Sequence, residues 1–326
     1  MRFEFYSEAI ANVPKLSVDG TVPNSVHFSH WVGNETPPEL KADTSTEIAL
    51  NLVASPSKAS LTQGIELVTN NHFDTDGVLS VWTVLNGERA LKYRDVLIAA
   101  AEAGDFSEYS SKDGVCVSLA IQGNDQAFPN EDTVSPLAGS ILNEAVTDDA
   151  RAYEAVLPQV EPLLSNPAAF ESLWRDGWHR ISTSMQSFES AKSRVQELGA
   201  TGVTLITLAQ DLFGAHGFNP ATHLVPFMAI ARFAKGELFV VSMPSDNGWY
   251  YRIDYPYYSW AETVVRPRIT RRDLSSVVDG LNRRERSPSG RWQKDDRELT
   301  SAVKFADENG ELVVSGLMPE EVVSEF

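Results

Sequence analysis

The chain has 326 residues, of which 42% are apolar and 22% charged, and its 45 acidic side chains outnumber the 27 Lys and Arg. This composition excludes a disordered chain, a coiled coil and a small disulfide-stapled fold, and the length suits about two domains. The formal net charge of −18 argues against binding to extended nucleic acid, because that binding depends on neutralising phosphates.

The sequence also bears on location. Its apolar runs are far shorter than the roughly 20 residues that a membrane-spanning helix needs, so no membrane partner is expected. Residues 1–6 read as a strand that contains an acidic residue rather than as a basic stretch before an apolar one, and a cytoplasmic location is therefore expected. The single cysteine, Cys116, lies in an apolar run and is expected to be a buried, inert thiol.

The N-terminal part alternates strand-like and helical patterns. Short runs at 26–28 and 65–69 predict strands, and helical spacing predicts helices at 44–52, 78–85 and 87–103. The apolar run at 115–121 predicts another strand. This alternation is typical of a mostly parallel α/β domain, assigned here to residues 1–136, whose last segment, 123–136, is a Pro- and Asn-rich loop.

The remainder of the chain predicts a helical connector over residues 137–200 and a smaller C-terminal α/β domain over residues 201–326. In the latter, 203–209 has a strand pattern, and Asn219-Pro220 suits the start of a helix that runs to Phe233. Residues 238–243 and 249–258 predict two paired strands. The predicted fold class is therefore α/β throughout.

Residues that could carry chemistry gather just after the predicted strand 65–69. His72, Asp74 and Asp76 occupy alternate positions of a polar turn, so all three side chains are expected to point the same way. Parallel α/β sheets bind ligands at this end of their strands. Two carboxylates and an imidazole suit one or two Mn²⁺ or Mg²⁺ ions, with iron or zinc as alternatives, and Gly77 is expected to permit a sharp turn into the next helix.

A structural interpretation of the same turn is that Asp74 and Asp76 form an Asx turn and cap the helix that follows. The two interpretations are compatible, since a capping carboxylate has a second oxygen. The polar run would be costly to bury without a ligand, which favours the metal site.

Further candidates lie elsewhere in the chain. Asp105, after the predicted helix stop at Gly104, could be a metal ligand or a catalytic group at the same sheet edge; the alternative is a plain turn. His30 follows the strand 26–28 and is a second catalytic candidate, or else a hydrogen-bonded loop histidine. His216, between small residues in a loop, is a third, with an ordinary histidine as the alternative. Asp43 is expected to be a charge at a helix N-terminus.

Residues 266–297 hold ten basic and five acidic side chains in an otherwise acidic chain. Arg268, Arg271, Arg272 and Arg291 could donate paired hydrogen bonds to a small anionic substrate. The alternative is a solvated helix face or a row of ion pairs between domains.

Residues 68–80, V-T-N-N-H-F-D-T-D-G-V-L-S, resemble the first motif of the DHH phosphoesterase superfamily, particularly its single-strand exonuclease branch. That motif is an apolar strand, D-x-D-x-D-G, an apolar pair and Ser; here His72 replaces the first acid. The chain has no Asp-His-His triplet and no C-terminal Gly-Gly-His loop. The resemblance implies manganese-binding roles for Asp74 and Asp76. Phrases at 28–31, 101–106 and 291–292 also resemble a bacterial family with no assigned function.

Taken together, these patterns predict a metal-dependent hydrolase of a small, anionic and phosphorylated substrate. One alternative is a non-catalytic ligand-binding or interaction protein derived from such a hydrolase. Another is a metal-dependent lyase or oxygenase, because the same ligands serve those reactions. No common serine-nucleophile or phosphate-loop signature is present in the sequence.

Overall fold

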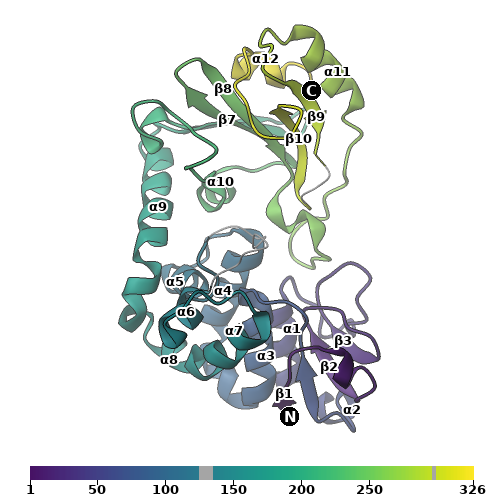
Figure 1. Ribbon diagram of the computed structural model, residues 1–326. Helices are drawn as coiled ribbons and strands as arrows, with labels where there is room; N and C mark the ends of the chain where they lie inside the picture. Colours follow the sequence, from purple (N-terminus) through teal and green to yellow (C-terminus); the bar gives the residue numbers. More distant parts are fainter. Residues whose placement is uncertain (125–134, 296–298) are drawn as a thin grey trace. The chain divides into compact units, whose positions relative to one another are not determined.

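The computed structural model describes residues 1–124, 135–295 and 299–326, and the chain divides into two compact units (Figure 1). Unit 1 comprises Met1–His179 and Trp260–Arg268, and unit 2 comprises Arg180–Ser259 and Ile269–Phe326. Each unit contains one β-sheet with helices packed against it, which confirms the predicted α/β class.

Unit 1 is built on a four-stranded sheet with the order β1-β4-β2-β3. The strands are β1 (Arg2–Phe3), β2 (Lys15–Val18), β3 (Ser25–Phe28) and β4 (Leu67–Thr69). All neighbouring pairs are parallel, as the sequence predicts. The carboxyl ends of the strands therefore lie along one edge, which is where ligands bind in sheets of this kind.

Helices make up most of the rest of unit 1. They are α1 (Ser45–Ala54), α2 (Lys58–Leu61), α3 (Thr75–Asn86), α4 (Arg94–Phe106), α5 (Lys112–Gln122), α6 (Pro136–Leu142), α7 (Asp149–Val156), α8 (Val160–Ser165) and the start of α9 (Glu171–Glu189). Helix α3 contacts β1, β2 and β4, whereas α1 contacts β3, and α1, α3 and α4 pack on one another. The apolar faces of these helices form the core of the unit together with β2 and β4.

Two predictions in unit 1 are wrong. The expected strand at 115–121 is helix α5, which Ser111 caps by accepting a hydrogen bond from the Gly114 N–H. Residues 114–122 are all buried, so this helix lacks the polar face that would have revealed its period. The single helix predicted at 87–103 is a 3₁₀ helix, Gly87–Tyr93, followed by α4. The loop predicted at 123–136 lies mostly outside the described residues.

Unit 2 contains a six-stranded sheet with the order β5-β6-β7-β8-β10-β9. Its strands are β5 (Arg194–Leu198), β6 (Val203–Thr207), β7 (Leu238–Ser245), β8 (Gly248–Asp254), β9 (Arg291–Lys294) and β10 (Ser301–Ala306). Only the β6–β7 pair of this sheet is parallel. Buried side chains such as Val240, Tyr251 and Phe305 form the core with Leu281 of α11 (Ser275–Arg284) and Val322 of α12 (Pro319–Val323).

The paired strands predicted at 238–243 and 249–258 are confirmed as β7 and β8. Two other expectations for this part of the chain are wrong. The last part of the helical connector predicted over residues 137–200 is strand β5. The helix expected from Asn219-Pro220 is limited to α10 (Phe227–Phe233). Pro226, which directly precedes α10, has non-helical backbone with φ −80° and ψ 67°, and suits the start of a helix rather than its interior.

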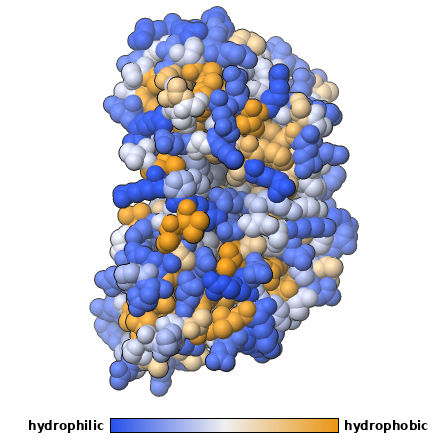
Figure 2. Space-filling model, turned by 180° about the vertical axis from the view of Figure 1, so that it is seen from behind, coloured by the Kyte–Doolittle hydropathy of each residue, from blue (hydrophilic) through white to orange (hydrophobic). Residues whose placement is uncertain are grey.

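On the face that Figure 2 shows, the surface is mostly hydrophilic, and the apolar residues lie in separate patches. Within the described ranges, no helix is both long and apolar enough to span a bilayer. Cys116 is a buried free thiol, as predicted, and burial raises its pKa to about 12.

Candidate metal centre

The edge formed by the carboxyl ends of the unit 1 strands brings acidic and imidazole side chains together. Asp19 directly follows β2, and His30 comes two residues after β3. Asp76 lies in the first turn of α3, and Asp105 lies in the last turn of α4. One ligand atom from each of these four buried residues lies within 4.8 Å of the others, an arrangement that could hold a metal ion. We call this set the first group.

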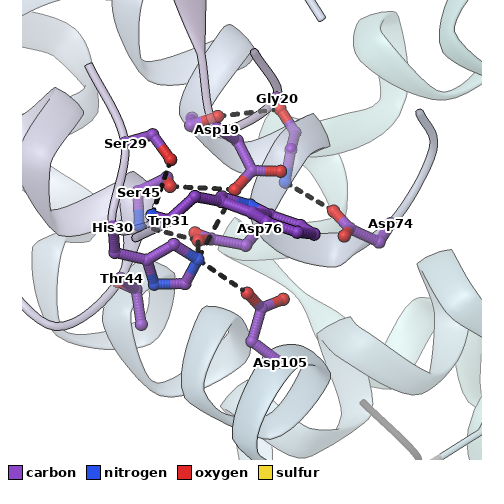
Figure 3. A network of polar contacts seen from close by, with 12 residues as sticks. Asp19, Gly20, Ser29, His30, Trp31, Thr44, Ser45, Asp74, Asp76 and Asp105 are labelled. Carbon is purple, nitrogen blue, oxygen red and sulfur yellow. Dashed lines mark hydrogen bonds and ion pairs between the residues drawn. The ribbon is translucent and has the colours of Figure 1, made fainter. Parts of the chain in front are cut away.

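His30 is the centre of the first group (Figure 3). Its ring is fully buried, and Nε2 lies 3.2 Å from Asp105 Oδ2, 3.6 Å from an Asp19 oxygen and 3.7 Å from an Asp76 oxygen. Among the described residues, Nε2 has no partner with hydrogen-bond geometry. A buried polar atom that faces three carboxylates without a hydrogen bond could hold a cation among them.

The other ring nitrogen of His30 fixes the tautomer. Nδ1 lies 2.6 Å from the backbone carbonyl oxygen of Asp43, and a carbonyl oxygen only accepts, so Nδ1 carries the hydrogen. In the neutral ring, Nε2 then offers its lone pair to the centre of the group. A histidine that binds a metal through one nitrogen and donates from the other to a carbonyl has this arrangement.

The electrostatics of the first group also call for positive charge. Burial raises the pKa of Asp105 well above its usual range, and the nearby carboxylates raise it further. Burial and Asp19 together raise the pKa of Asp76 to about 6. Burial lowers the pKa of His30, but the three carboxylates outweigh burial and raise it to about 10. A proton or a metal ion at Nε2 would relieve this excess of negative charge.

Helix α1 also contributes to the group. Its first two N–H groups, from Ser45 and Thr46, each donate to one oxygen of Asp76 at 2.7 Å. The Ser45 hydroxyl donates to Asp19 at 2.8 Å. The positive end of the helix dipole therefore supports two of the buried carboxylates and orients them toward His30.

A second group consists of Asp19, His72 and Asp74. His72 Nε2 lies 2.9 Å from Asp19 Oδ2 and 3.0 Å from Asp74 Oδ2, and its Nδ1 faces the amide oxygen of Asn71 at 3.0 Å. The side chain of His72 is 30% exposed, whereas that of Asp19 is 1% exposed. The second group is thus the more accessible of the two.

Asp19 belongs to both groups. Its Oδ1 faces His30, and its Oδ2 faces His72. Burial raises the pKa of Asp19, but His72 and His30 outweigh burial and lower it below the usual range. A carboxylate with each oxygen directed at a different imidazole is suited to bridge two cations.

The predicted ligands divide between the two groups. His72 and Asp74 are in the second, whereas Asp76 and Asp105 are in the first, together with His30. The expectation that His72, Asp74 and Asp76 point the same way is wrong, because Asp76 is already helical and the alternation of an extended chain stops at Asp74. Asp74 also caps α3, since its Oδ1 accepts the Gly77 N–H at 2.7 Å, which confirms the capping interpretation of this residue.

Two glycines permit the close approaches that build the site. Gly77 is helical rather than a sharp turn, as its place in α3 shows, and a Cβ there would lie 2.3 Å from the Asn70 amide nitrogen. Asp105 lies within α4 rather than after a stop at Gly104. A Cβ on Gly104 would lie 2.7 Å from that of Thr75 in α3, so this glycine lets α4 approach α3 closely enough for Asp105 to reach the group.

Other predicted residues belong to neither group. His216 is in unit 2, with a side chain 91% exposed, and pairs with Asp246 at 2.8 Å. Arg272 pairs with Glu237, and Arg271 lies over the ring of Tyr255 at 5.0 Å. Arg268 and Arg291 are exposed. A role for these four arginines in substrate binding stays a prediction.

The sequence patterns miss Asp19 and one contact of Asp43. Asp19 follows a strand, β2, that was not predicted; the alternation of Leu16 and Val18 before Asp-Gly is the signal that could have revealed it. Asp43 directly precedes Thr44, the N-cap of α1, as expected of a charge at a helix N-terminus, and its carboxylate also accepts from backbone N–H groups of residues 264–266.

The fold and the site define an α/β protein with a buried Asp/His cluster that could bind metal. The chain belongs to DUF6687, a family of unknown function whose model matches residues 1–310. No curated protein and no solved structure matches it. The resemblance to the DHH superfamily therefore rests on residues 68–80 alone.

Proposed function

We propose that this protein is a metal-dependent hydrolase of a small phosphorylated substrate, with two divalent cations bridged by Asp19. The observation that carries the proposal is His30 Nε2, which is buried, lacks a hydrogen-bond partner among the described residues and faces three carboxylates. Mixed imidazole and carboxylate ligands suit Mn²⁺, and also Fe²⁺ or Zn²⁺, better than Mg²⁺.

The difference in exposure between the groups gives each ion its own role. The first group is closed to solvent, which suits an ion that holds the helices and the sheet edge together. The second group keeps its partly exposed His72 at the surface and offers three protein ligands from the part of the chain that the structure describes, so water or a substrate oxygen would complete the coordination.

Paired cations of this kind hydrolyse phosphate esters by well-understood chemistry. A bound dication lowers the pKa of its water ligand, and a pair of ions stabilises charge on both the attacking and the leaving oxygen. This chemistry needs no serine or cysteine nucleophile, which agrees with the lack of such signatures in the sequence. The likeness of residues 68–80 to a phosphoesterase motif supports phosphate as the group attacked.

The experiment begins with metal content. The full chain is purified without chelator, and its metals are measured before and after removal with EDTA and reloading with Mn²⁺. We expect about two ions per chain. Asp76→Asn is expected to lose at least one ion, whereas Asp113→Asn, which changes an exposed carboxylate of α5, should bind as the native chain does. Circular dichroism checks that both variants are folded.

Activity is then measured on phosphomonoesters, phosphodiesters and nucleotides with Mn²⁺. Hydrolysis that EDTA abolishes and Asp76→Asn lacks would support the proposal. A native chain that takes up fewer than about 0.2 ions would overturn the metal site itself. If metal is bound but every phosphorylated substrate stays intact, the hydrolase is wrong; the near-complete burial of the first group would then favour a non-catalytic metal-binding protein.

A further inference from the structure

Residues 260–268, which we call the strap, belong to unit 1 although the chain on both sides of them belongs to unit 2. Backbone hydrogen bonds hold the strap in place. The Glu262 N–H donates to the carbonyl oxygen of His30 at 2.7 Å. The carboxylate of Asp43 accepts from the N–H groups of Val264, of Val265 at 2.8 Å and of Arg266 at 3.1 Å.

The side chain of Arg266 adds a charged anchor. It pairs with Asp43 at 2.7 Å, Glu102 at 2.7 Å and Glu108 at 2.6 Å, lies over the ring of Phe106 at 4.8 Å and is only 15% exposed. Without this guanidinium, three half-buried or buried carboxylates would face one another with no cation between them. Ion pairs as well as backbone hydrogen bonds therefore hold the strap in place.

Every one of these anchors is next to a candidate metal ligand. Asp43, which binds the strap through its carboxylate, accepts the Nδ1–H of His30 through its own carbonyl oxygen. Glu102 and Phe106 belong to the same part of α4 as Asp105. The indole of Trp260 meets the His30 ring edge to face, with ring centres 5.0 Å apart, and packs on Trp31 at 4.8 Å.

We propose that Asp43 and Arg266 are positioning residues of the metal centre, and that docking of the strap and binding of a cation at His30 strengthen each other. This inference rests on the proposed function, since it assumes a cation in the first group. The carbonyl of Asp43 holds the tautomer and the orientation in which Nε2 can bind metal, and Arg266 holds Asp43. Because such coupling is reciprocal, the cation should in turn tighten the strap.

The first experiment measures Mn²⁺ affinity in a background that reports the first group alone. His72→Gln removes the imidazole of the second group, and the full chain is stripped with EDTA and titrated calorimetrically. In that background, Arg266→Met is expected to weaken Mn²⁺ binding by about tenfold or more, and Arg266→Lys by less, because Lys keeps the charge but not the fork. Arg89→Met is the matched control, since Arg89 pairs with Glu161 elsewhere in unit 1.

If Arg266→Met does not fold, Asp43→Asn carries the same test, because the amide oxygen can still accept from the N–H groups of Val264 and Val265 while both bonds from Arg266 are lost. The ¹⁵N chemical shifts of His30 give a signature that a merely structural role would not produce. In the native chain loaded with diamagnetic Zn²⁺, Nδ1 should be protonated and Nε2 metal-bound, and Arg266→Met should lose that fixed pattern and recover it at high Zn²⁺.

The second experiment measures amide hydrogen exchange at residues 264–266. Mn²⁺ is expected to slow exchange there in the native chain and not in Arg266→Met. Unchanged Mn²⁺ affinity in a folded Arg266→Met or Asp43→Asn variant, or exchange that does not respond to Mn²⁺, would overturn this inference and leave the proposed function standing. A native chain that binds no Mn²⁺ would instead overturn the proposed function and this inference with it.

Discussion

Burying an acidic cluster costs folding free energy, and Asp105 shows this cost most clearly. Three carboxylates share the first group with one imidazole, and the side chain of Asp105 is 4% exposed. The folded chain must therefore either bury these negative charges in a place where water cannot screen them or hold protons on the carboxyls, as the raised pKa values of Asp76 and Asp105 indicate. Without metal, this arrangement lowers the unfolding free energy of the chain, as is common in functional sites.

Asp105→Asn should therefore separate stability from metal binding. In EDTA, we expect the variant to be more stable to urea than the native chain, by about 1 kcal/mol, because the raised pKa of Asp105 means that folding must either protonate this carboxyl or bury its charge. In Mn²⁺ the order should reverse, since the native chain gains binding energy that the variant lacks. Asp113→Asn, at an exposed site, should match the native chain in both conditions. A variant that is less stable than the native chain in EDTA would contradict this reasoning.

Much of the site follows from residue types and spacing. His72, Asp74, Asp76, Asp105 and His30 are all recognisable as polar groups placed near predicted strand or helix ends, and the structure puts each of them in one of the two groups. Asp19 is not recognisable in this way, because β2 has only four residues and returns to its parallel neighbour β3 through six residues without a helix. Parallel strands usually need a longer crossover, so the short alternation of Leu16 and Val18 did not by itself predict a parallel strand here.

At the scale of an element, the first turn of α3 connects the sheet of unit 1 to the candidate metal site. Asp74 caps the helix, Asp76 reaches α1, and Gly77 lets Asn70 and Tyr153 come close. The Asn70 amide donates to the Tyr153 hydroxyl at 3.0 Å and lies 3.5 Å from Asp19. This turn therefore sets the spacing between the two groups.

Gly77→Ala tests that spacing. The new methyl group would lie 2.3 Å from the Asn70 amide and 2.8 Å from the Tyr153 hydroxyl, so both must shift. We expect a loss of about 1 to 3 kcal/mol in unfolding free energy and weaker Mn²⁺ binding, measured by urea unfolding and titration. Gly199→Ala, which meets nothing within 4 Å, should change neither quantity. Native Mn²⁺ affinity in Gly77→Ala would show that the turn does not set the site.

Helices and strands could be predicted from the sequence where they show an amphipathic pattern, but not where their side chains are buried on all sides. Helix α1 shows a capping residue and helical spacing, and its predicted start agrees with Thr44 as the N-cap. Helix α5 is buried along most of its length, so its apolar run could not be told from that of a strand. For the same reason, an apolar run alone did not reveal that Cys116 is helical.

Glu285, at the C-terminal end of α11, should make the unfolding free energy depend on pH. Burial raises its pKa, but hydrogen bonds from Ser315, Ser287, Gly316 and Trp292 outweigh burial and lower it below the usual value of 4.5. The bond lengths are 2.7 to 2.9 Å. The charged and titratable groups nearby are Arg286, Tyr251 and Glu321.

The lowered pKa fixes the sign of the pH effect. The stability that Glu285 contributes is present above the pKa of the unfolded chain, about 4.5, and is lost as pH falls through the lower folded value. Glu285→Gln should cost about 1 to 3 kcal/mol at pH 7, since the amide nitrogen cannot accept. The deficit should shrink below about pH 4.5 in urea unfolding, whereas exposed Glu308→Gln should show none. A deficit that stays constant into acid would contradict this assignment.

At the scale of the whole molecule, both candidate cation groups belong to unit 1, whereas the chain enters and leaves the strap from unit 2. The strap is thus a segment of unit 1, and the chain on either side of it carries β8 and α11 of unit 2. Ligand binding stabilises the part of a protein that holds the ligand, so the two units offer an internal comparison.

Mn²⁺ should therefore stabilise unit 1 more than unit 2. At a free concentration of about 100 times Kd, each ion should add about 2.7 kcal/mol to the unfolding free energy of the unit that binds it. Calorimetric melting with Mn²⁺ and with EDTA, with hydrogen exchange to assign each transition, should show the unit 1 transition moving to higher temperature. In Arg266→Met this shift should shrink, because the strap no longer supports the cation site. Equal shifts of both units would mean that they unfold together, and the absence of any shift would remove the case for a metal centre, since a site that binds cations in the folded chain alone must stabilise that chain.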